Sequence, residues 1–114
     1  MMMNTIVELP EYKKHAEKLL SDDENKQIIS YLAEHPKAGV LMQGTGGVRK
    51  LRWAREGGGK SGGVRVIYYF HSEALPLFML TMFGKGKKAN LSKAESHLLS
   101  QLTKVLVENY RSHT

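Results

Sequence analysis

VRKLRWAR, at Val48–Arg55, and VRVIYYFH, at Val64–His71, are the two segments that decide the fold, because basic and apolar side chains alternate over Lys50–Trp53 and the second segment is apolar or aromatic between Arg65 and His71. Such alternation predicts β-strands, since successive side chains of a strand point to opposite faces of a sheet. Lys50 and Arg52 then share one face of the first strand, while Leu51 lies on the other.

The second strand and a third one extend this pattern. Arg65 shares a face with Ile67 and Tyr69, and the residues between them are apolar or aromatic. The segment Leu77–Phe83 is apolar at nearly every position. It therefore predicts a central strand that is buried on both of its faces.

An edge strand and a pair of helices are predicted before these strands. Residues 5–9 form a short apolar stretch that Pro10 ends. The next stretch has the spacing of an amphipathic helix. Its apolar face holds Tyr12, Ala16, Leu19 and Leu20.

Two capping boxes mark the starts of the other helices. Ser21 with Glu24 predicts one start, and Pro36 predicts that this helix ends near His35. Ser92 with Glu95 predicts the start of the last helix. We expect that helix to bury Leu98, Leu102, Val105 and Leu106.

These elements predict a single α+β domain over residues 1–114. We expect a small, mostly antiparallel, twisted sheet, with the N-terminal helical pair on one face and a C-terminal helix. If Leu51 and Trp53 point toward the helical pair, Lys50 and Arg52 point to the opposite, partly free face. This register argument predicts a cationic cleft on that face.

Positive charge is concentrated in the middle of the chain. Of the net charge of +6, residues 43–88 carry +7, from nine basic and two acidic side chains, and the remainder carries −1. This asymmetry points to a polyanionic partner, most plausibly nucleic acid. The alternative is a solvated basic surface that only keeps the protein in solution.

Composition also excludes some kinds of site. The chain has no cysteine, so it has no disulfide, no thiolate zinc site and no catalytic thiol. Its five histidines are dispersed, and we expect neither a metal nor another cofactor. The first residues are not typical of a signal peptide or a membrane span, and we expect a cytoplasmic protein without a membrane partner.

Two features near the strands have competing interpretations. The segment GGGKSGG at Gly57–Gly63 lacks the leading glycine of a phosphate-binding loop, and it connects two strands. We interpret it as a flexible connection whose Lys60 is a candidate RNA contact. Tyr69 shares the face of Arg65, so its ring either packs against a helix or stacks on an RNA base.

Three segments together resemble the RelE/HigB toxins of bacterial type II toxin–antitoxin systems, and most closely the HigB branch. They are QGTGGVRKLRW from Gln43, GGVRVIYYF from Gly62 and LTMFGKGKKANLS from Leu80. The resemblance implies the RelE-like fold and a ribosome-dependent messenger RNA endonuclease that inhibits translation. It also implies neutralisation by a cognate antitoxin, through which toxin and antitoxin bind operator DNA as a hetero-oligomer.

The same resemblance implies which residues form the site. Arg65 corresponds to the arginine near the scissile phosphate, Lys50 and Arg52 to a pair of strand cations, and Lys85 to a cation after the last strand. We expect Arg65 to hold the phosphate, Lys50 to act as the general base and Lys85 to serve the leaving group. The candidate RNA-binding residues are Arg49, Lys60, Tyr69, Lys87 and Lys88.

Two other functions remain open at the level of sequence. ParE-like toxins share the fold and bind DNA gyrase, in which case the basic strand face is a surface for protein binding. A noncatalytic RNA-binding module would use the same arginines only to hold phosphates. The cluster of cations at Lys50, Arg52, Arg65 and Lys85 favours the nuclease over the gyrase-binding toxin.

Overall fold

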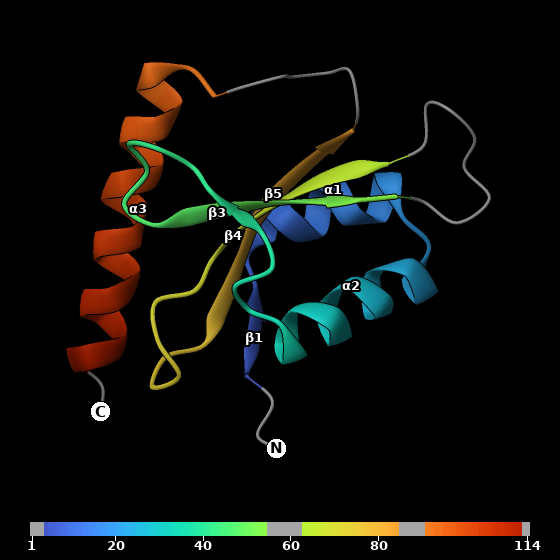
Figure 1. The fold of residues 1–114 in the computed structure, drawn as a ribbon, viewed down its shortest axis with the longest axis horizontal. Helices are drawn as coiled ribbons and strands as arrows, with labels where there is room; N and C mark the ends of the chain where they lie inside the picture. Colours follow the sequence, from blue (N-terminus) through green and yellow to red (C-terminus); the bar gives the residue numbers. More distant parts are fainter. Residues whose placement is uncertain (1–3, 55–62, 85–90, 113–114) are drawn as a thin grey trace.

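The computed structural model describes residues 4–54, 63–84 and 91–112. The predicted edge strand, the helices and the three long strands are present, and a two-residue strand that the sequence pattern did not predict is added (Figure 1). In chain order the elements are β1 (Ile6–Glu8), α1 (Pro10–Leu19), α2 (Asp22–Glu34), β2 (Val40–Leu41), β3 (Val48–Trp53), β4 (Val64–Tyr69), β5 (Leu77–Gly84) and α3 (Lys93–Ser112).

The five strands form one sheet in the order β1-β5-β4-β3-β2. β1 pairs with β5 in parallel, and the other three pairs are antiparallel, so the sheet is mostly antiparallel as predicted. β4 is the middle strand, and β5 lies between it and the β1 edge. A bulge in β5 makes Leu80 an extra residue between the partners of Ile67 and Tyr68.

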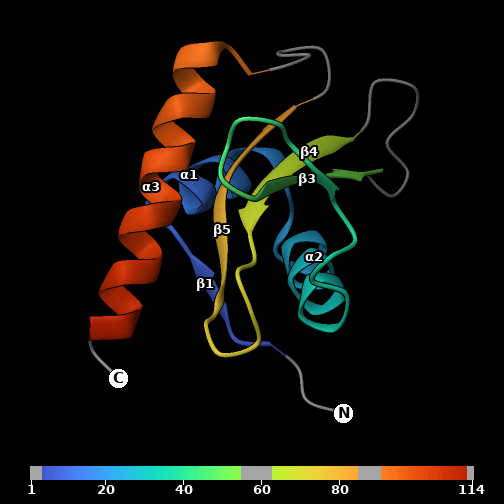
Figure 2. The same ribbon diagram turned by 60° about the vertical axis from the view of Figure 1, so that its left-hand side comes forward.

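The helices cover the sheet from two sides, with α2 and α3 on opposite faces (Figure 2). Leu51 and Trp53 pack against the core that the helical pair covers, which confirms their predicted orientation. The buried residues of that core are Tyr12, Ala16, Leu20, Ile28, Leu32, Leu51, Val64, Val66, Tyr68, Leu77, Met79 and Met82. Those of the core under α3 are Val48, Ile67, Tyr69, Leu75, Phe78, Leu80 and Val107.

Both predicted capping boxes are present. The Ser21 hydroxyl accepts a hydrogen bond from the amide of Glu24 at 3.1 Å, and the Glu24 carboxylate accepts one from the amide of Ser21 at 3.0 Å. Ser92 and Glu95 repeat this exchange at 3.1 and 2.9 Å. Each box satisfies two amide groups that have no partner within the first turn of a helix.

The buried face of α3 matches the prediction in part. Leu102 and Leu106 pack against the core as predicted. Leu98 is 63% exposed and Val105 is 50% exposed, so the expectation that they are buried is wrong. Leu99, about a third of a turn from Leu98, packs against the core as well. Two apolar stripes overlap on this helix, and helical spacing alone does not tell which one meets the sheet.

The turn between β2 and β3 packs against α3. The hydroxyl of Thr45 donates a hydrogen bond to the carbonyl of Met42 at 2.7 Å and accepts one from the amide of Val48 at 3.1 Å. Gly46 has a φ of +78°, and a Cβ atom there would lie 2.8 Å from the hydroxyl of Thr103 on α3. Glycine is therefore required at this position, for backbone conformation and for close approach.

Within residues 4–54, 63–84 and 91–112, none of the helices is both long enough and apolar enough to cross a bilayer.

Candidate nucleic-acid interface

Three predicted site residues come together on the α3 side of the sheet. Arg52 of β3 lies directly opposite Arg65 of β4, and Lys50 is on the same face two residues before Arg52. Directly opposed residues have Cβ atoms about 4.5–5.5 Å apart, and same-face neighbours along a strand are about 6.8 Å apart. We call Lys50, Arg52 and Arg65 the cationic row.

On both strands, the exposure of the side chains increases from the core under α3 toward Arg52 and Arg65. On β3, Val48 is buried, Lys50 is half-buried and Arg52 is exposed. On β4, Ile67 is buried and Arg65 is half-buried. The apolar part of this face belongs to the core under α3, while the cationic row is accessible to solvent. Three of the predicted cations therefore share one solvent-accessible face, and the cleft itself stays a prediction.

The cationic row has no acidic partner in the described part of the chain. The two ion pairs found there join His15 to Glu11 and His35 to Glu34, and neither includes a residue of the row. Like charges that face each other across two strands destabilise a sheet. Three cations that no acidic side chain of the described residues neutralises are a favourable place for an external anion.

Lys50 also lines a small cavity at the start of α3. This cavity of about 300 Å³ is bounded by residues of β2 and the following turn, and by Leu91 and Ser96 at the beginning of the helix. The start of α3 is capped by Ser92 and Glu95, so the positive charge beside this cavity comes from Lys50.

Arg49 does not join the cationic row. It points to the face of the helical pair, where its guanidinium donates hydrogen bonds to the carbonyls of Lys37 at 3.2 Å and Gly39 at 2.8 Å. These bonds fasten the segment between α2 and β2 to β3. The contacts of Arg49 in this structure are therefore internal, although the sequence analysis placed it among the RNA contacts.

Tyr69 is on the predicted face but belongs to the core. Its side chain is 5% exposed and packs in the core under α3, and its hydroxyl lies 3.0 Å from Nδ1 of His71. A buried ring has no free face for a base, so the geometry supports the packing interpretation and not stacking. The alternation placed Tyr69 correctly, but it did not reveal that α3 covers this part of the sheet.

The other predicted cations lie outside the described residues. These are Lys60 in the connection between β3 and β4, and Lys85, Lys87 and Lys88 after β5. The last residue of β5, Gly84, pairs with Val64, next to the Arg65 position in β4. The membership of Lys60, Lys85, Lys87 and Lys88 in the site stays a prediction.

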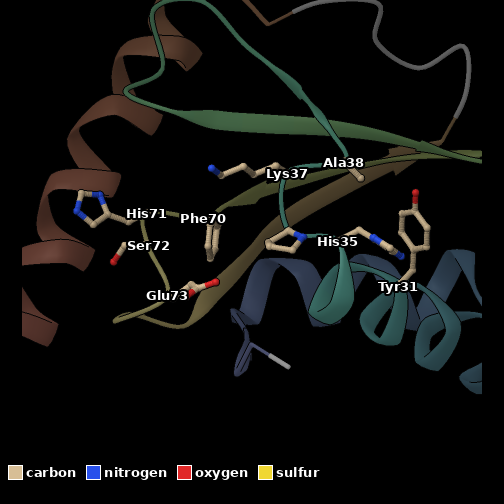
Figure 3. A pocket seen from close by; sticks show the side chains of 9 residues that line it. Tyr31, His35, Lys37, Ala38, Phe70, His71, Ser72 and Glu73 are labelled. Atoms are coloured by element: carbon tan, nitrogen blue, oxygen red, sulfur yellow. The ribbon is translucent and has the colours of Figure 1, made fainter. Parts of the chain in front are cut away.

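A larger cavity, of about 770 Å³, lies near the opposite end of β4 from Arg65. It is bounded by the end of α2 and the loop after β4, and its side chains do not converge on one point, since His71 and Tyr31 lie at opposite ends (Figure 3). In the described part of the chain, no three His, Asp or Glu side chains gather in a way that suits a metal ion. We therefore assign the candidate site to the cationic row.

Comparisons with known proteins place the chain in a family. A family model described as the RelE toxin of the RelE/RelB toxin–antitoxin system matches residues 8–113. A solved structure of a mutant E. coli toxin RelE in the free state matches with a TM-score of 0.58 and 19% identity, covering 92% of this chain and 100% of that chain. This likeness confirms the predicted RelE-like fold. Because the family model spans nearly the whole sequence, the chain belongs to the RelE toxin family of toxin–antitoxin systems.

Proposed function

We propose that this toxin is a ribosome-dependent endonuclease that cleaves messenger RNA and thereby inhibits translation. The observation that carries the proposal is the pairing of Arg52 with Arg65 across two neighbouring strands, beside Lys50 and without an acidic partner in the described residues. The negative charge of a phosphodiester is complementary to this arrangement, and RNA supplies the nucleophile of the reaction, its own 2′-hydroxyl.

In this reaction the protein must orient the RNA and stabilise the negative charge that develops on its phosphate. A bond forms between the 2′-oxygen and phosphorus, the bond from phosphorus to the 5′-oxygen breaks, and a proton passes from the first oxygen to the second. Arg65 is suited to hold two phosphate oxygens at once through its planar guanidinium, and it stays protonated throughout. The neutral amine form of Lys50 accepts the proton of the 2′-hydroxyl, and the ammonium group of Lys85 donates a proton to the leaving 5′-oxygen.

Dependence on the ribosome follows from the limited contribution of the cationic row to the reaction. Three cations on a sheet face stabilise negative charge but do not bend the RNA backbone so that the 2′-oxygen is in line with the leaving oxygen. A ribosome that presents the codon in an extended form supplies this alignment. The basic surface also favours binding to ribosomal RNA, since each phosphate contact releases counterions.

A cognate antitoxin would neutralise the toxin by covering the cationic row. Acidic side chains of the antitoxin are complementary to Lys50, Arg52 and Arg65, and an antitoxin bound there would keep the toxin off the ribosome. Binding to operator DNA would then take place through the antitoxin.

The test compares wild type with two variants at one position, Arg65→Ala and Arg65→Lys. Purified protein is incubated with ribosomes programmed with a defined message, and new 5′ ends are mapped. We expect Arg65→Ala to lower the cleavage rate about 10²–10³-fold, the usual effect of losing one donor to a transition state. Arg65→Lys keeps the charge but loses the bidentate geometry, so it should recover only part of the rate.

Three results would contradict the proposal. Arg65→Ala that is folded and cleaves like wild type would remove Arg65 from the site. Efficient cleavage of the same message without ribosomes would contradict the division of work between toxin and ribosome. If induction in cells causes DNA damage and leaves messages intact, the chain is a gyrase-directed toxin of the ParE type.

A further inference from the structure

The cationic row continues onto a third strand, where it ends in an aromatic ring. Arg65 of β4 lies directly opposite Arg52 on one side and directly opposite Phe83 of β5 on the other. Phe83 is half-buried and packs against the core under α3, so it is on the same face as the two arginines. Arg52, Arg65 and Phe83 thus form one line across three neighbouring strands, with adjacent positions about 4.8 Å apart.

Phe83 is also part of the wall of a groove. The groove has a volume of about 650 Å³ and lies between α1, β5 and α3, and most of its lining is apolar. Its size is within the usual range of about 300–1,000 Å³ for small-molecule sites. The residues that line it are Leu9, Pro10, Glu11, His15, Leu80, Thr81, Met82, Phe83, Leu91, Glu95, Leu99 and Leu102.

We propose that this groove binds one base of the RNA, the base of the nucleotide whose phosphate lies on Arg65. The inference rests on the proposed function, because it takes the phosphate on the row as given. A nucleotide is a planar, largely apolar ring joined to an anion, and the structure offers an aromatic ring and an apolar groove directly beside two arginines that form no ion pair within the described residues. Base stacking on aromatic rings is the general way in which proteins hold unpaired RNA.

Polar groups also line the groove. Glu95 is one of them, and its carboxylate accepts a hydrogen bond from the amide of Ser92 at 2.9 Å. A carboxylate accepts hydrogen bonds from the exocyclic amino groups of cytosine, adenine and guanine, and also from the ring N3–H of uracil. We therefore expect the groove to hold a base by stacking, without a strong preference among the four bases.

The position of the groove favours RNA over a protein segment as its occupant. Its Phe83 side is continuous with the cationic row, so a ligand that fills it and reaches Arg65 has one apolar planar part and one anionic part. Glu11 and Glu95 line the groove, and Glu11 is paired with His15 at 2.7 Å. Two carboxylates disfavour an anionic group inside the groove, whereas a base is uncharged and leaves its phosphate outside, on the row.

The experiment combines changes in the protein with changes in the RNA. Wild type, Phe83→Leu and the control Leu98→Ala are compared on programmed ribosomes, with messages that carry an abasic nucleotide at each position next to the cleaved bond. Leu98 is exposed on α3 and does not line the groove. We expect Phe83→Leu to lower kcat/KM about 5- to 160-fold on the normal message, which corresponds to the ~1–3 kcal/mol of one stacked base.

The decisive measurement is the non-additivity of the two changes. At one position the abasic message should slow wild type to a similar degree, and Phe83→Leu should then lose little more, because the ring and the base act together. Leu98→Ala should match wild type, and thermal unfolding checks that each variant is folded.

The outcomes separate this inference from the function on which it rests. If wild type does not cleave, the proposed function fails and the inference with it. If wild type cleaves and the losses from Phe83→Leu and from every abasic position simply add, the groove does not bind a base. If Phe83→Leu cleaves normally but escapes neutralisation by the antitoxin, the groove is a docking site for protein and the inference is wrong.

Discussion

Two arginines on one strand should respond in opposite ways when their charge is removed. Arg49 and Arg52 are three residues apart on β3 and lie on opposite faces of the sheet. Arg49 donates hydrogen bonds to two backbone carbonyls, whereas Arg52 opposes Arg65. We expect Arg49→Gln to reduce stability and keep catalysis, and Arg52→Gln to reduce catalysis and keep or increase stability.

The size of each effect follows from its surroundings. Two guanidinium groups about 6 Å apart in water repel each other by about 0.7 kcal/mol, and salt at physiological strength halves this. Arg52→Gln should therefore raise the melting temperature by about 1–3 °C at low salt and by less in ~1 M salt. Loss of the charge-assisted bonds of Arg49 should cost about 1.5–3 kcal/mol, and the melting temperature should fall by about 5–10 °C.

Thermal unfolding at low and high salt gives the stability part, and cleavage of a programmed message gives the catalytic part. Arg52→Gln should cleave about 10²–10³-fold more slowly than wild type, and Arg49→Gln should cleave like wild type below its melting temperature. If the melting temperature of Arg52→Gln is as low as that of Arg49→Gln, the opposed arginines do not destabilise the fold by charge repulsion. If both variants lose catalysis equally, strand alternation does not separate the site from the scaffold.

Two further predictions concern the scaffold. Tyr68→Phe should cost about 1–3 kcal/mol at neutral pH, because the buried amide of Gly39 loses the hydroxyl that accepts its hydrogen bond at 2.8 Å. Burial raises the pKa of Tyr68 above the ordinary tyrosine value of ~10. The stabilisation by the Tyr68 hydroxyl is therefore complete below pH ~10 and is lost as the pH rises through the pKa of the folded state. In denaturant unfolding, the free energy of unfolding of Tyr68→Phe should fall less at alkaline pH than that of wild type. Gly46→Ala should be less stable than Gly44→Ala by about 1–3 kcal/mol. Both glycines have positive φ, but only at Gly46 does the added carbon come within 2.8 Å of Thr103. Equal losses of stability would show that backbone conformation alone determines the cost of the substitution.

Alternation and capping were the parts of the sequence that carried the most information. Alternation placed Lys50, Arg52 and Arg65 on one face and Leu51 on the other, because the register of a strand with one buried face is strongly determined. The capping boxes placed the starts of α2 and α3, since hydroxyl and carboxylate groups at this spacing satisfy the first amides of a helix. These are local effects, which a sequence expresses directly.

The parts that the sequence did not predict depend on contacts between distant segments. Leu98 and Leu99 are neighbours on an apolar surface of α3, and only docking against the sheet determines that Leu99 is the packed one. β2 is two residues long and exists because its backbone pairs with β3. The place of Phe83 beside Arg65 requires the register of β4 with β5, which a bulge shifts, and no pattern within either strand reveals it.

The scaffold and the candidate site occupy the same strands, and this explains how the fold tolerates opposed cations. β3 and β4 bury Val48, Ile67 and Tyr69 under α3, while their other face supports the core of the helical pair. Each of these apolar side chains contributes about 1.5–3 kcal/mol by burial, which exceeds the repulsion of less than about 1 kcal/mol between Arg52 and Arg65. The pairing of the strands therefore fixes the backbone positions of Arg52 and Arg65 directly opposite each other. For the proposed cleavage of RNA, a backbone prepared in this way reduces the rearrangement needed when the phosphate binds, and this is the condition under which electrostatic stabilisation of a transition state is most effective.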